Sequence, residues 1–295
     1  MSILIQENTK VLIQGITGKE GQKAAKSMME LGTEVVGGVR PGKGGEEVLG
    51  LPVFDTVADA KEKFSDITTS AVYVPPFAAK EAALEAIEAG VPQINIVTEG
   101  IPIQDTAEIL AEARERDIRI IGPSSLGFIS PGDGRVGMIG GRKDQVEEIY
   151  QPGKIGIISR SGGMSNELAW QVRQAGYGQS TVVHVGGDML MGTDYKDLLE
   201  LFEEDGQTEA VILFGEHGGS YEFEIVELIK DNKFSKPLAV YVGGEFANNL
   251  PEGMNIGHAG AIVEAGKGAK AKAQALEEVG VKIADHYEQL IHLVT

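Results

Sequence analysis

The sequence predicts an α/β protein of two doubly wound domains, each a mostly parallel sheet with helices on both faces. Three observations support this prediction. Short apolar runs rich in β-branched residues recur along the chain, helix-forming stretches separate them, and a glycine-rich turn follows the first run of each half. Alternating strands and helices form right-handed crossovers between parallel strands. Such sheets bind their ligands beyond the carboxyl ends of the strands.

Ten apolar runs are the predicted strands, because near-continuous apolar strands are typical of parallel sheets that are covered on both faces. The first five lie at 11–14, 35–39, 71–74, 94–97 and 118–121, and the second five lie at 155–159, 181–185, 210–214, 238–242 and 281–284. Two sets of five strands predict two domains.

The stretches between these runs predict helices and one connection. Residues 78–90 (AAKEAALEAIEAG) are rich in alanine and glutamate and end at Gly90, so they predict a helix. The glycine-rich stretch 131–153 lies between the two sets of strands and is interpreted as the connection between the domains. We therefore expect one domain over residues 1–128 and the other over residues 129–295.

Composition limits the classes of function. The 295 residues are 42% hydrophobic and 24% charged, as in folded domains with sizeable cores, and the absence of cysteine excludes disulfides and thiolate metal sites. A net charge of −18 disfavours a general nucleic-acid binder. No apolar run approaches the ~20 residues of a membrane span, and the N-terminus lacks the layout of a signal peptide, so we expect a cytoplasmic protein.

The first glycine-rich turn, VLIQGITGKEG, places Gly15, Gly18 and Gly21 between a strand and a helix. Glycines at such a turn let a ligand phosphate approach the free N–H groups of the helix. A dinucleotide site would show G-x-G-x-x-G and an acidic residue at the end of the second strand. That strand ends here without a carboxylate, and Arg40 and Lys43 add positive charge. The turn therefore disfavours NAD and favours a nucleotide with an extra ribose phosphate, for which coenzyme A and NADP both qualify.

The second glycine-rich turn, IGIISRSGGMSNE, would place Ser161, Gly162 and Gly163 at the start of a helix, where their amides could bind an anion. The same turn resembles the nucleophile elbow of serine hydrolases, and the chain order Ser161, Glu216, His258 matches theirs. Ser159 stands where the elbow has its first glycine, which argues against a hydrolase.

Glu216 and His258 are the predicted catalytic pair. Glu216 follows a predicted strand, and His258 lies in the glycine-rich segment GMNIGHAGAI, where the backbone leaves room for a ligand to approach the ring. A carboxylate that accepts one ring N–H would leave the other nitrogen free as a nucleophile. The remaining histidines, interpreted as structural or surface residues, are His184, His217, His286 and His292. No close ligand spacing predicts a metal site.

A resemblance to a known family covers nearly the whole chain. Its motifs are NTKVLIQGITGKEG, GGVRPGKGG, LPVFDTV, YVPPF and TEGIP in the first half, and SRSGG, VGGD, GEHGG and GHAGAI in the second. By these motifs the chain is identified as a member of the succinate–CoA ligase (succinyl-CoA synthetase) α-subunit family. The resemblance implies a Rossmann-like domain that binds coenzyme A, followed by a flavodoxin-like ligase domain.

The resemblance also implies a mechanism and a partner. A β subunit with an ATP-grasp site would bind ATP or GTP with Mg²⁺, form an αβ heterodimer or heterotetramer with this chain, and phosphorylate the histidine that corresponds to His258. The phosphoryl group would pass to a small di- or tricarboxylic acid, and the thiol of coenzyme A would then displace phosphate from the acyl phosphate.

The same motifs imply roles for further residues. Glu216 corresponds to the carboxylate that pairs with the phosphohistidine, and Ser161 and Gly162 open the helix whose N-terminus steadies the phosphate. The positions that correspond to the coenzyme A site are Thr17, Gly18, Lys19, Glu20, Lys43, Val97, Thr98 and Glu99.

The chain departs from the family where the acid should bind. It reads SRSGGMSNE where succinate ligases usually read SRSGTLTYE, so Asn166 occupies the position of a tyrosine near the substrate. It also lacks two basic residues before the histidine, and IGPSSLG replaces IGPNCPG. SRSGGMSNEL is closer to ATP-citrate lyase and citryl-CoA synthetase, and asparagine would give a larger hydroxylated acid more room and more hydrogen bonds. No citrate-synthase-like domain follows, so we expect a ligase subunit rather than a complete lyase.

The leading hypothesis is therefore an acid–CoA ligase α subunit, with succinate as the family default and citrate, malate or a related hydroxy acid next. Two alternatives belong to other classes: a coenzyme A-sensing module without catalysis, and the serine hydrolase. The sequence leaves open the acid, the nucleotide, the direction of the reaction and the number of αβ pairs.

Overall fold

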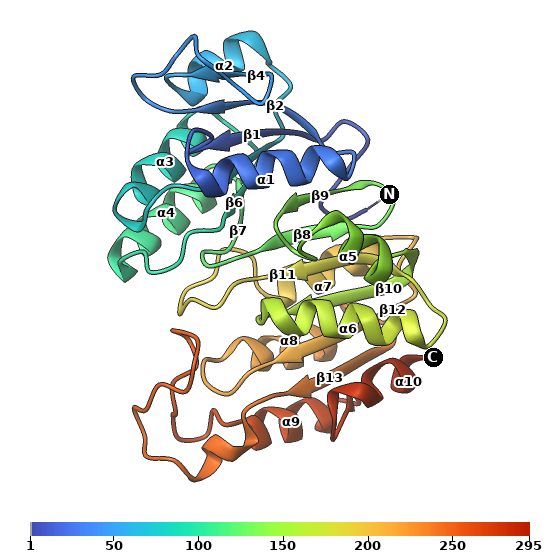
Figure 1. The fold of residues 1–295 in the computed structure, drawn as a ribbon. Helices are drawn as coiled ribbons and strands as arrows, with labels where there is room; N and C mark the ends of the chain where they lie inside the picture. Colours follow the sequence, from blue (N-terminus) through green and yellow to red (C-terminus); the bar gives the residue numbers. More distant parts are fainter. Residues whose placement is uncertain (1) are drawn as a thin grey trace.

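The computed structural model describes residues 2–295, which form two α/β domains that follow one another along the chain (Figure 1). Each domain is built on a seven-stranded sheet. Among residues 2–295 no helix is both long and apolar enough to cross a membrane.

The first sheet is parallel except at one edge. In chain order its strands are β1 (Lys10–Gln14), β2 (Glu34–Val39), β3 (Glu47–Val48), β4 (Leu51–Phe54), β5 (Thr69–Val72), β6 (Gln93–Ile96) and β7 (Arg119–Ile121). Their order across the sheet is β3-β4-β2-β1-β5-β6-β7, with β3 antiparallel to β4. The order reverses between β1 and β5, so the ligand crevice of a doubly wound sheet should lie beyond these two strands.

Four helices cover the first sheet: α1 (Lys19–Glu30), α2 (Val57–Lys63), α3 (Pro76–Glu88) and α4 (Ile103–Glu115). The buried stripe of α1 consists of Gly21, Ala24, Ala25 and Met28, spaced three or four residues apart as a helix face requires. Side chains of this stripe share one apolar cluster with residues of the second domain, whereas α2, α3 and α4 enclose a separate cluster on the other face. The α1 helix therefore ties the two domains together.

The second sheet has five parallel strands and an antiparallel hairpin at one edge. In chain order its strands are β8 (Gly127–Ser130), β9 (Gly134–Gly137), β10 (Pro152–Ser159), β11 (Gln179–His184), β12 (Ala210–Gly215), β13 (Leu238–Val242) and β14 (Lys282–Ile283). Their order is β14-β13-β12-β10-β11-β8-β9, so the reversal lies between β10 and β12.

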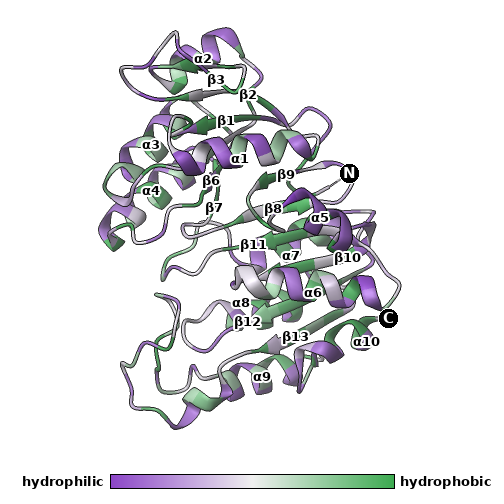
Figure 2. Ribbon diagram, viewed as in Figure 1, coloured by the Kyte–Doolittle hydropathy of each residue, from purple (hydrophilic) through white to green (hydrophobic). Residues whose placement is uncertain are grey.

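Helices cover both faces of the second sheet. They are α5 (Lys143–Ile149), α6 (Gly162–Gln174), α7 (Tyr195–Glu204), α8 (Tyr221–Lys230), α9 (Ala269–Glu278) and α10 (Leu290–Val294), with 3₁₀ turns at Glu245–Asn249 and Tyr287–Gln289. Side chains of α5, α6 and α10 pack in one cluster, and side chains of α7, α8 and α9 pack in another. The strands are mostly hydrophobic, while the helices mix hydrophobic and hydrophilic residues (Figure 2), as expected for a sheet between two helix layers.

The sequence-based assignments are largely confirmed. All ten predicted strands are present, and the predicted helix 78–90 corresponds to α3. Four strands were missed: β3, β4, β8 and β9. They are two to four residues long, and glycine or proline interrupts all of them except β3, so no apolar run marks them.

The interpretation of residues 131–153 as a connection is wrong. These residues contain β9, α5 and the start of β10, all of which belong to the second domain. Their glycines serve a close hairpin: a Cβ on Gly127 would collide with the carbonyl oxygen of Val136, and one on Gly137 with that of Leu126. The expected boundary at residue 128 falls within β8, whereas the second sheet begins at Gly127.

Candidate active site

The carboxyl ends of β10, β12 and β13 surround a cavity of about 340 Å³. Ser161 follows β10, Glu216 follows β12, and Gly243 and Gly244 follow β13. The segment that carries His258 closes the cavity from the side. This is the point where the strand order reverses, so the fold itself accounts for the position of the cavity.

His258 and Glu216 form the predicted pair. The Nδ1 atom of His258 lies 2.6 Å from Oε1 of Glu216, and the side chains are 37% and 12% exposed. The hydrogen bond with the carboxylate raises the pKa of His258 above its ordinary value, although burial of the ring acts in the opposite direction. With Nδ1–H donated to Glu216, the Nε2 atom remains available to react.

The glycines around His258 have specific neighbours. A Cβ on Gly187 would lie 2.8 Å from Cδ2 of the His258 ring, and one on Gly260 would collide with the guanidinium of Arg160. A Cβ on Gly218 would lie 2.6 Å from the backbone of Ile262. The three glycines therefore let the loop after β12, the loop after β11 and the histidine segment meet without side chains between them.

Arg160 is a buried cation at the base of the site that the sequence reasoning missed. Its side chain is 2% exposed, its Nε lies 4.0 Å from Oε2 of Glu216, and its Nη2 donates to the carbonyl oxygen of Asp188 at 2.7 Å. The guanidinium also lies 5.9 Å from the ring centroid of Tyr221, within cation–π range. The signal was available, because a charged residue that directly follows an apolar strand lies at the carboxyl edge of the sheet.

The N-terminus of α6 opens toward the cavity through Ser161. Its Oγ accepts a hydrogen bond from the amide of Met164 at 3.3 Å and so acts as the N-cap. Gly162 and Gly163 form the first turn of α6, and Gly163 is exposed. A Cβ on Gly162 would crowd the end of the Leu126 side chain, which would have to shift.

Asn166 lies outside the set of residues that line the cavity. Its Oδ1 accepts hydrogen bonds from the Tyr150 hydroxyl at 2.7 Å and from the Gly140 amide at 3.1 Å. The oxygen of the Asn166 side chain is therefore occupied, and its NH₂ group is the part that remains to donate a hydrogen bond to a carboxylate.

The serine-hydrolase alternative requires a hydrogen bond between Ser161 and His258. Within residues 2–295 no such bond is present, and the Oγ of Ser161 is used as a helix cap. The geometry therefore does not supply the serine–histidine contact that a hydrolase requires.

The first glycine turn forms a second potential site, at the carboxyl edge of the first sheet. Gly18 is the N-cap of α1 and provides no side-chain cap, so the first amides of α1 remain open to an anion. Gly15 has a φ of +88°, and a Cβ there would lie 2.6 Å from the carbonyl oxygen of Tyr73. Thr17 is half-buried, and Lys19 and Glu20 are exposed in the first turn of the helix.

The other residues assigned to coenzyme A surround the same edge. Lys43 follows β2 and is exposed, with Glu46 at 2.7 Å. Val97, Thr98 and Glu99 follow β6, and the hydroxyl of Thr98 donates to the carbonyl oxygen of Val74 at 2.7 Å. The structure therefore brings the eight predicted positions to the ends of three strands of one sheet, β1, β2 and β6.

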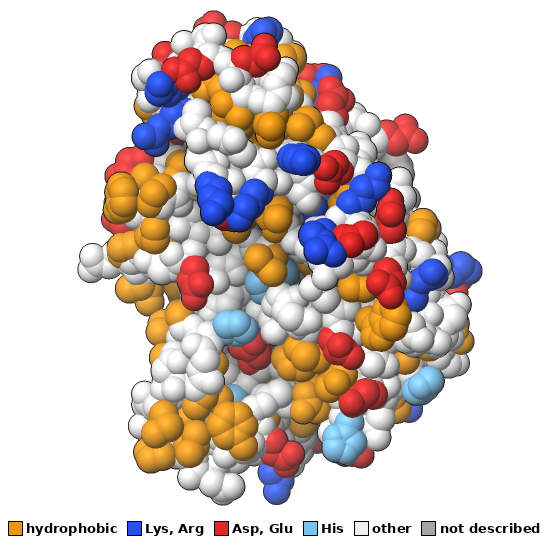
Figure 3. Space-filling model, viewed as in Figure 1, with side chains coloured by type: hydrophobic (Ala, Val, Ile, Leu, Met, Phe, Trp, Pro, Cys, Tyr) orange, Lys and Arg blue, Asp and Glu red, His pale blue; other side chains and the backbone are white. Residues whose placement is uncertain are grey.

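The two sites lie close enough to interact electrostatically. Glu99 of the first domain contributes to the raised pKa of His258, and it adds to burial in raising the pKa of Asp188. In Figure 3 the surface is hollowed between the two domains, and histidine and acidic side chains lie along the hollow. A ligand bound at the first glycine turn could therefore extend toward His258.

Two of the other histidines are buried and accept hydrogen bonds from backbone amides. His184 is buried, its Nδ1 accepts from the Leu126 amide at 2.7 Å, and its Nε2 lies 2.7 Å from the Arg160 carbonyl oxygen. Burial lowers the pKa of His184 to about 4, so this ring stays neutral. His217 is also buried and accepts from the Ala269 amide at 3.3 Å, while His286 and His292 are exposed.

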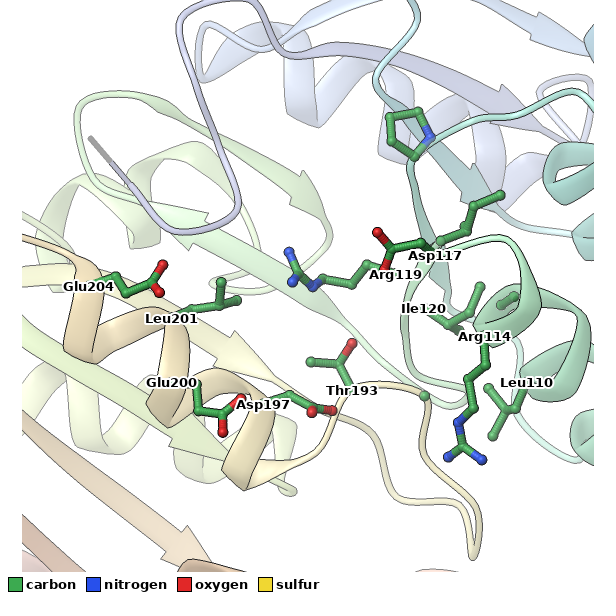
Figure 4. A pocket seen from close by; sticks show the side chains of 14 residues that line it. Leu110, Arg114, Asp117, Arg119, Ile120, Thr193, Asp197, Glu200, Leu201 and Glu204 are labelled. Carbon is green, nitrogen blue, oxygen red and sulfur yellow. The ribbon is translucent and has the colours of Figure 1, made fainter. Parts of the chain in front are cut away.

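A larger cavity, of about 610 Å³, lies elsewhere between the domains (Figure 4). Arg114 and Arg119 line it from the first domain, and Asp197, Glu200 and Glu204 of α7 line it from the second. None of the predicted site residues lines this cavity. Among residues 2–295 no cluster of three or more metal-ligating side chains is found.

Two family models match different parts of the chain. A family model described as "CoA binding domain" matches residues 6–100, and one described as "CoA-ligase" matches residues 158–284. Among curated proteins, the chain is 43% identical to succinate–CoA ligase [ADP-forming] subunit alpha 2 of Archaeoglobus fulgidus, over 100% of this chain and 99% of that protein.

Other relatives act on other acids. The chain is 44% identical to the malate–CoA ligase subunit alpha of Methylorubrum extorquens over 96% of this chain and 94% of that one. It is 41% identical to an ADP-forming sulfoacetate–CoA ligase subunit of an Acholeplasma species. That match covers 97% of this chain and 94% of that protein. Identity alone therefore does not select the acid.

A solved structure with the same fold is the ATP citrate lyase of Methanothrix soehngenii in complex with citrate and coenzyme A. It superposes with a TM-score of 0.90 at 25% identity, and the match covers 99% of this chain. This chain spans half the length of that protein chain.

Proposed function

Since this chain belongs to the family of α subunits of ADP-forming acid–CoA ligases, we propose that it carries a phosphoryl group on His258 while an acid is joined to coenzyme A. The observation that carries this proposal is the hydrogen bond of 2.6 Å between His258 and Glu216, at a cavity that the helix start at Ser161 also lines. A partner β subunit would supply the nucleotide, with its Mg²⁺.

The proposed first step is attack by Nε2 of His258 on the γ-phosphorus of the nucleotide, which forms an N–P bond and releases the nucleoside diphosphate. The Nδ1–H bond to Glu216 fixes the tautomer and stabilises positive charge on the ring during attack. The open amides at the start of α6 and their positive dipole end would stabilise the phosphoryl oxygens.

In the second proposed step, a carboxylate oxygen of the acid attacks the phosphorus, the N–P bond breaks, and an acyl phosphate forms. Coenzyme A, when bound, supplies the thiol that replaces phosphate at the acyl carbon. The residues present fit such a group, because the uncapped amides after Gly18 can bind a phosphate and Lys43, which follows the neighbouring strand β2, adds a cation at the same edge of the sheet. Thr17, Lys19, Glu20, Val97, Thr98 and Glu99 complete the proposed site.

Succinate is the proposed acid, as the substrate named for several relatives. Citrate is the second candidate, because SRSGGMSNEL resembles citrate-activating enzymes and the solved citrate lyase shares the fold. Asn166, Gly162 and Gly163 are proposed to contact the acid or phosphate. The Asn166 amide is free to donate such a bond, while its oxygen is already occupied.

The test is phosphorylation of the complex of this chain with its β subunit, using nucleotide labelled at the γ-phosphate. We expect label that is lost in acid, retained in base and absent from a His258→Asn variant; label that persists in that variant would refute the proposal. Formation of acyl-CoA with succinate, malate, sulfoacetate and citrate then identifies the acid. No turnover with any of these acids, although His258 is labelled, would favour a regulatory coenzyme A-binding role.

A further inference from the structure

A buried ion pair contacts the backbone of Glu216. The Nζ atom of Lys272 lies 2.5 Å from Oε2 of Glu222, and the side chains are 0% and 1% exposed. Lys272 lies near the start of α9, and Glu222 lies in the first turn of α8. Neither residue lines the cavity that contains His258.

The pair forms hydrogen bonds with both the backbone N–H and the backbone C=O of Glu216. The carboxylate of Glu222 accepts a hydrogen bond from the Glu216 amide at 3.0 Å. The ammonium of Lys272 donates to the Glu216 carbonyl oxygen at 2.7 Å and also to that of Gly218. A Cβ on Gly215 would lie 2.7 Å from Oε1 of Glu222, so glycine at 215 is needed for this approach.

This arrangement is costly for stability alone. Two fully buried charges lose their hydration, and an apolar pair of similar size is often at least as stable. The lysine also lies near the N-terminal end of α9, where the helix dipole disfavours a cation. The polar contacts of the pair converge instead on one short loop, the loop that carries the partner of His258.

We propose that Lys272 and Glu222 are positioning residues, which fix the loop after β12 so that the Glu216 carboxylate stays in hydrogen-bond contact with His258. The inference rests on the proposed function for its catalytic consequence, but its structural part concerns only this chain. Loss of the pair should allow the Glu216 carboxylate to move away from Nδ1, while the residues that touch the substrates stay in place.

The first measurement is the titration of the His258 ring by NMR in the full chain, which needs neither nucleotide nor partner. In Lys272→Met we expect the His258 pKa to fall toward the ordinary value of about 6.5, as it should in Glu216→Gln. Lys270→Met, an exposed lysine on the same helix, is the matched control and should leave the titration unchanged. Unchanged titration in a folded Lys272→Met chain would overturn the proposal.

A second variant separates positioning from folding. Lys272→Met leaves Glu222 buried without its cation, which can destabilise the fold, whereas Lys272→Met combined with Glu222→Gln removes both charges and keeps an acceptor for the Glu216 amide. We expect the double variant to regain thermal stability but not the wild-type titration of His258. Recovery of both would show that the pair acts on stability only.

The third measurement is kinetic. In the complex with the β subunit we expect kcat for acyl-CoA formation to fall by about 10- to 100-fold in the double variant, with the KM for the acid unchanged, the size of effect that outer partners of metal-bound histidines typically have. If the wild-type complex does not phosphorylate His258, the proposed function fails, and the titration still decides the positioning role.

Discussion

The two glycine turns of this molecule have the same local layout and different surroundings. Each follows a central strand of a doubly wound sheet and opens a helix, α1 in the first domain and α6 in the second. At the first turn the helix start has no side-chain cap, and the charged side chains of that turn, Lys19 and Glu20, are exposed. At the second turn Ser161 caps the helix, and Arg160, Glu216 and His258 lie around it.

The difference teaches how one local motif can serve two purposes. An uncapped helix start beside flexible surface cations suits a soluble ligand that brings its own phosphates. A capped start next to a buried arginine and a histidine–carboxylate pair suits a reaction, because its charged groups are already fixed in place. The first turn is therefore suited to binding coenzyme A, and the second is suited to phosphoryl transfer.

The largest expected effect concerns the second turn. Glu216→Gln retains the size of the side chain but loses the charge that stabilises the His258 ring, so phosphorylation of His258 should slow by roughly 100- to 1,000-fold. Rapid-quench measurement of the label on the α–β complex checks this. Glu252→Gln, an exposed carboxylate in the neighbouring loop, should retain the wild-type rate. A Glu216→Gln rate within a few-fold of wild type would mean that the pair is not catalytic.

The next effect concerns the first turn. Gly15→Ala adds a Cβ at a φ of +88° and 2.6 Å from a backbone oxygen, so it should cost about 3 kcal/mol of unfolding free energy or distort the turn and weaken coenzyme A binding. The control is Gly32→Ala, which has a φ of +87° and open space around its Cβ. Denaturant unfolding and calorimetric titration with coenzyme A measure both effects. Equal losses in the two variants would show that backbone strain alone, rather than the close approach, matters.

The pH dependence sharpens the contrast between the turns. Only the neutral His258 ring has a free Nε2 lone pair, and the Glu216 carboxylate raises the pKa of this ring. The phosphorylation rate should therefore fall as the pH drops through a midpoint above the ordinary histidine value of about 6.5. Coenzyme A binding at the first turn should show no such transition. An acid limb that does not move to lower pH in Glu216→Gln would contradict this assignment.

The smallest effect concerns the surface cation of the first turn. Lys43→Ala removes an exposed charge next to the proposed phosphate site, so the KM for coenzyme A should rise by about 3- to 10-fold, with kcat unchanged and with a weaker salt dependence. Lys230→Ala removes a lysine with a similar surface ion pair in the second domain. It should leave the KM unchanged, and a similar rise in both variants would point to a general loss of positive charge.

The parallel core and the pairing of Glu216 with His258 could be predicted from the sequence. The long apolar strands stand out because both of their faces are buried, and Glu216 and His258 stand out because glycines surround them. The strands β3, β4, β8 and β9 could not be predicted in the same way, because they are only two to four residues long, and proline in β4 and glycine in β8 and β9 leave no continuous apolar run. For the same reason 131–153 was mistaken for a connection.

By itself the sequence determined the two-domain α/β plan, the family and the candidate residues, since strand pattern and short motifs depend on neighbours along the chain. The tertiary structure alone decided which charges support the site. Arg160, Glu222 and Lys272 come from three different parts of the second domain, and each reaches Glu216 only after folding. It also turned the Asn166 oxygen toward Tyr150. Buried polar groups form hydrogen bonds with whichever groups the packed chain brings next to them. The spacing of residues along the sequence does not show which groups these are.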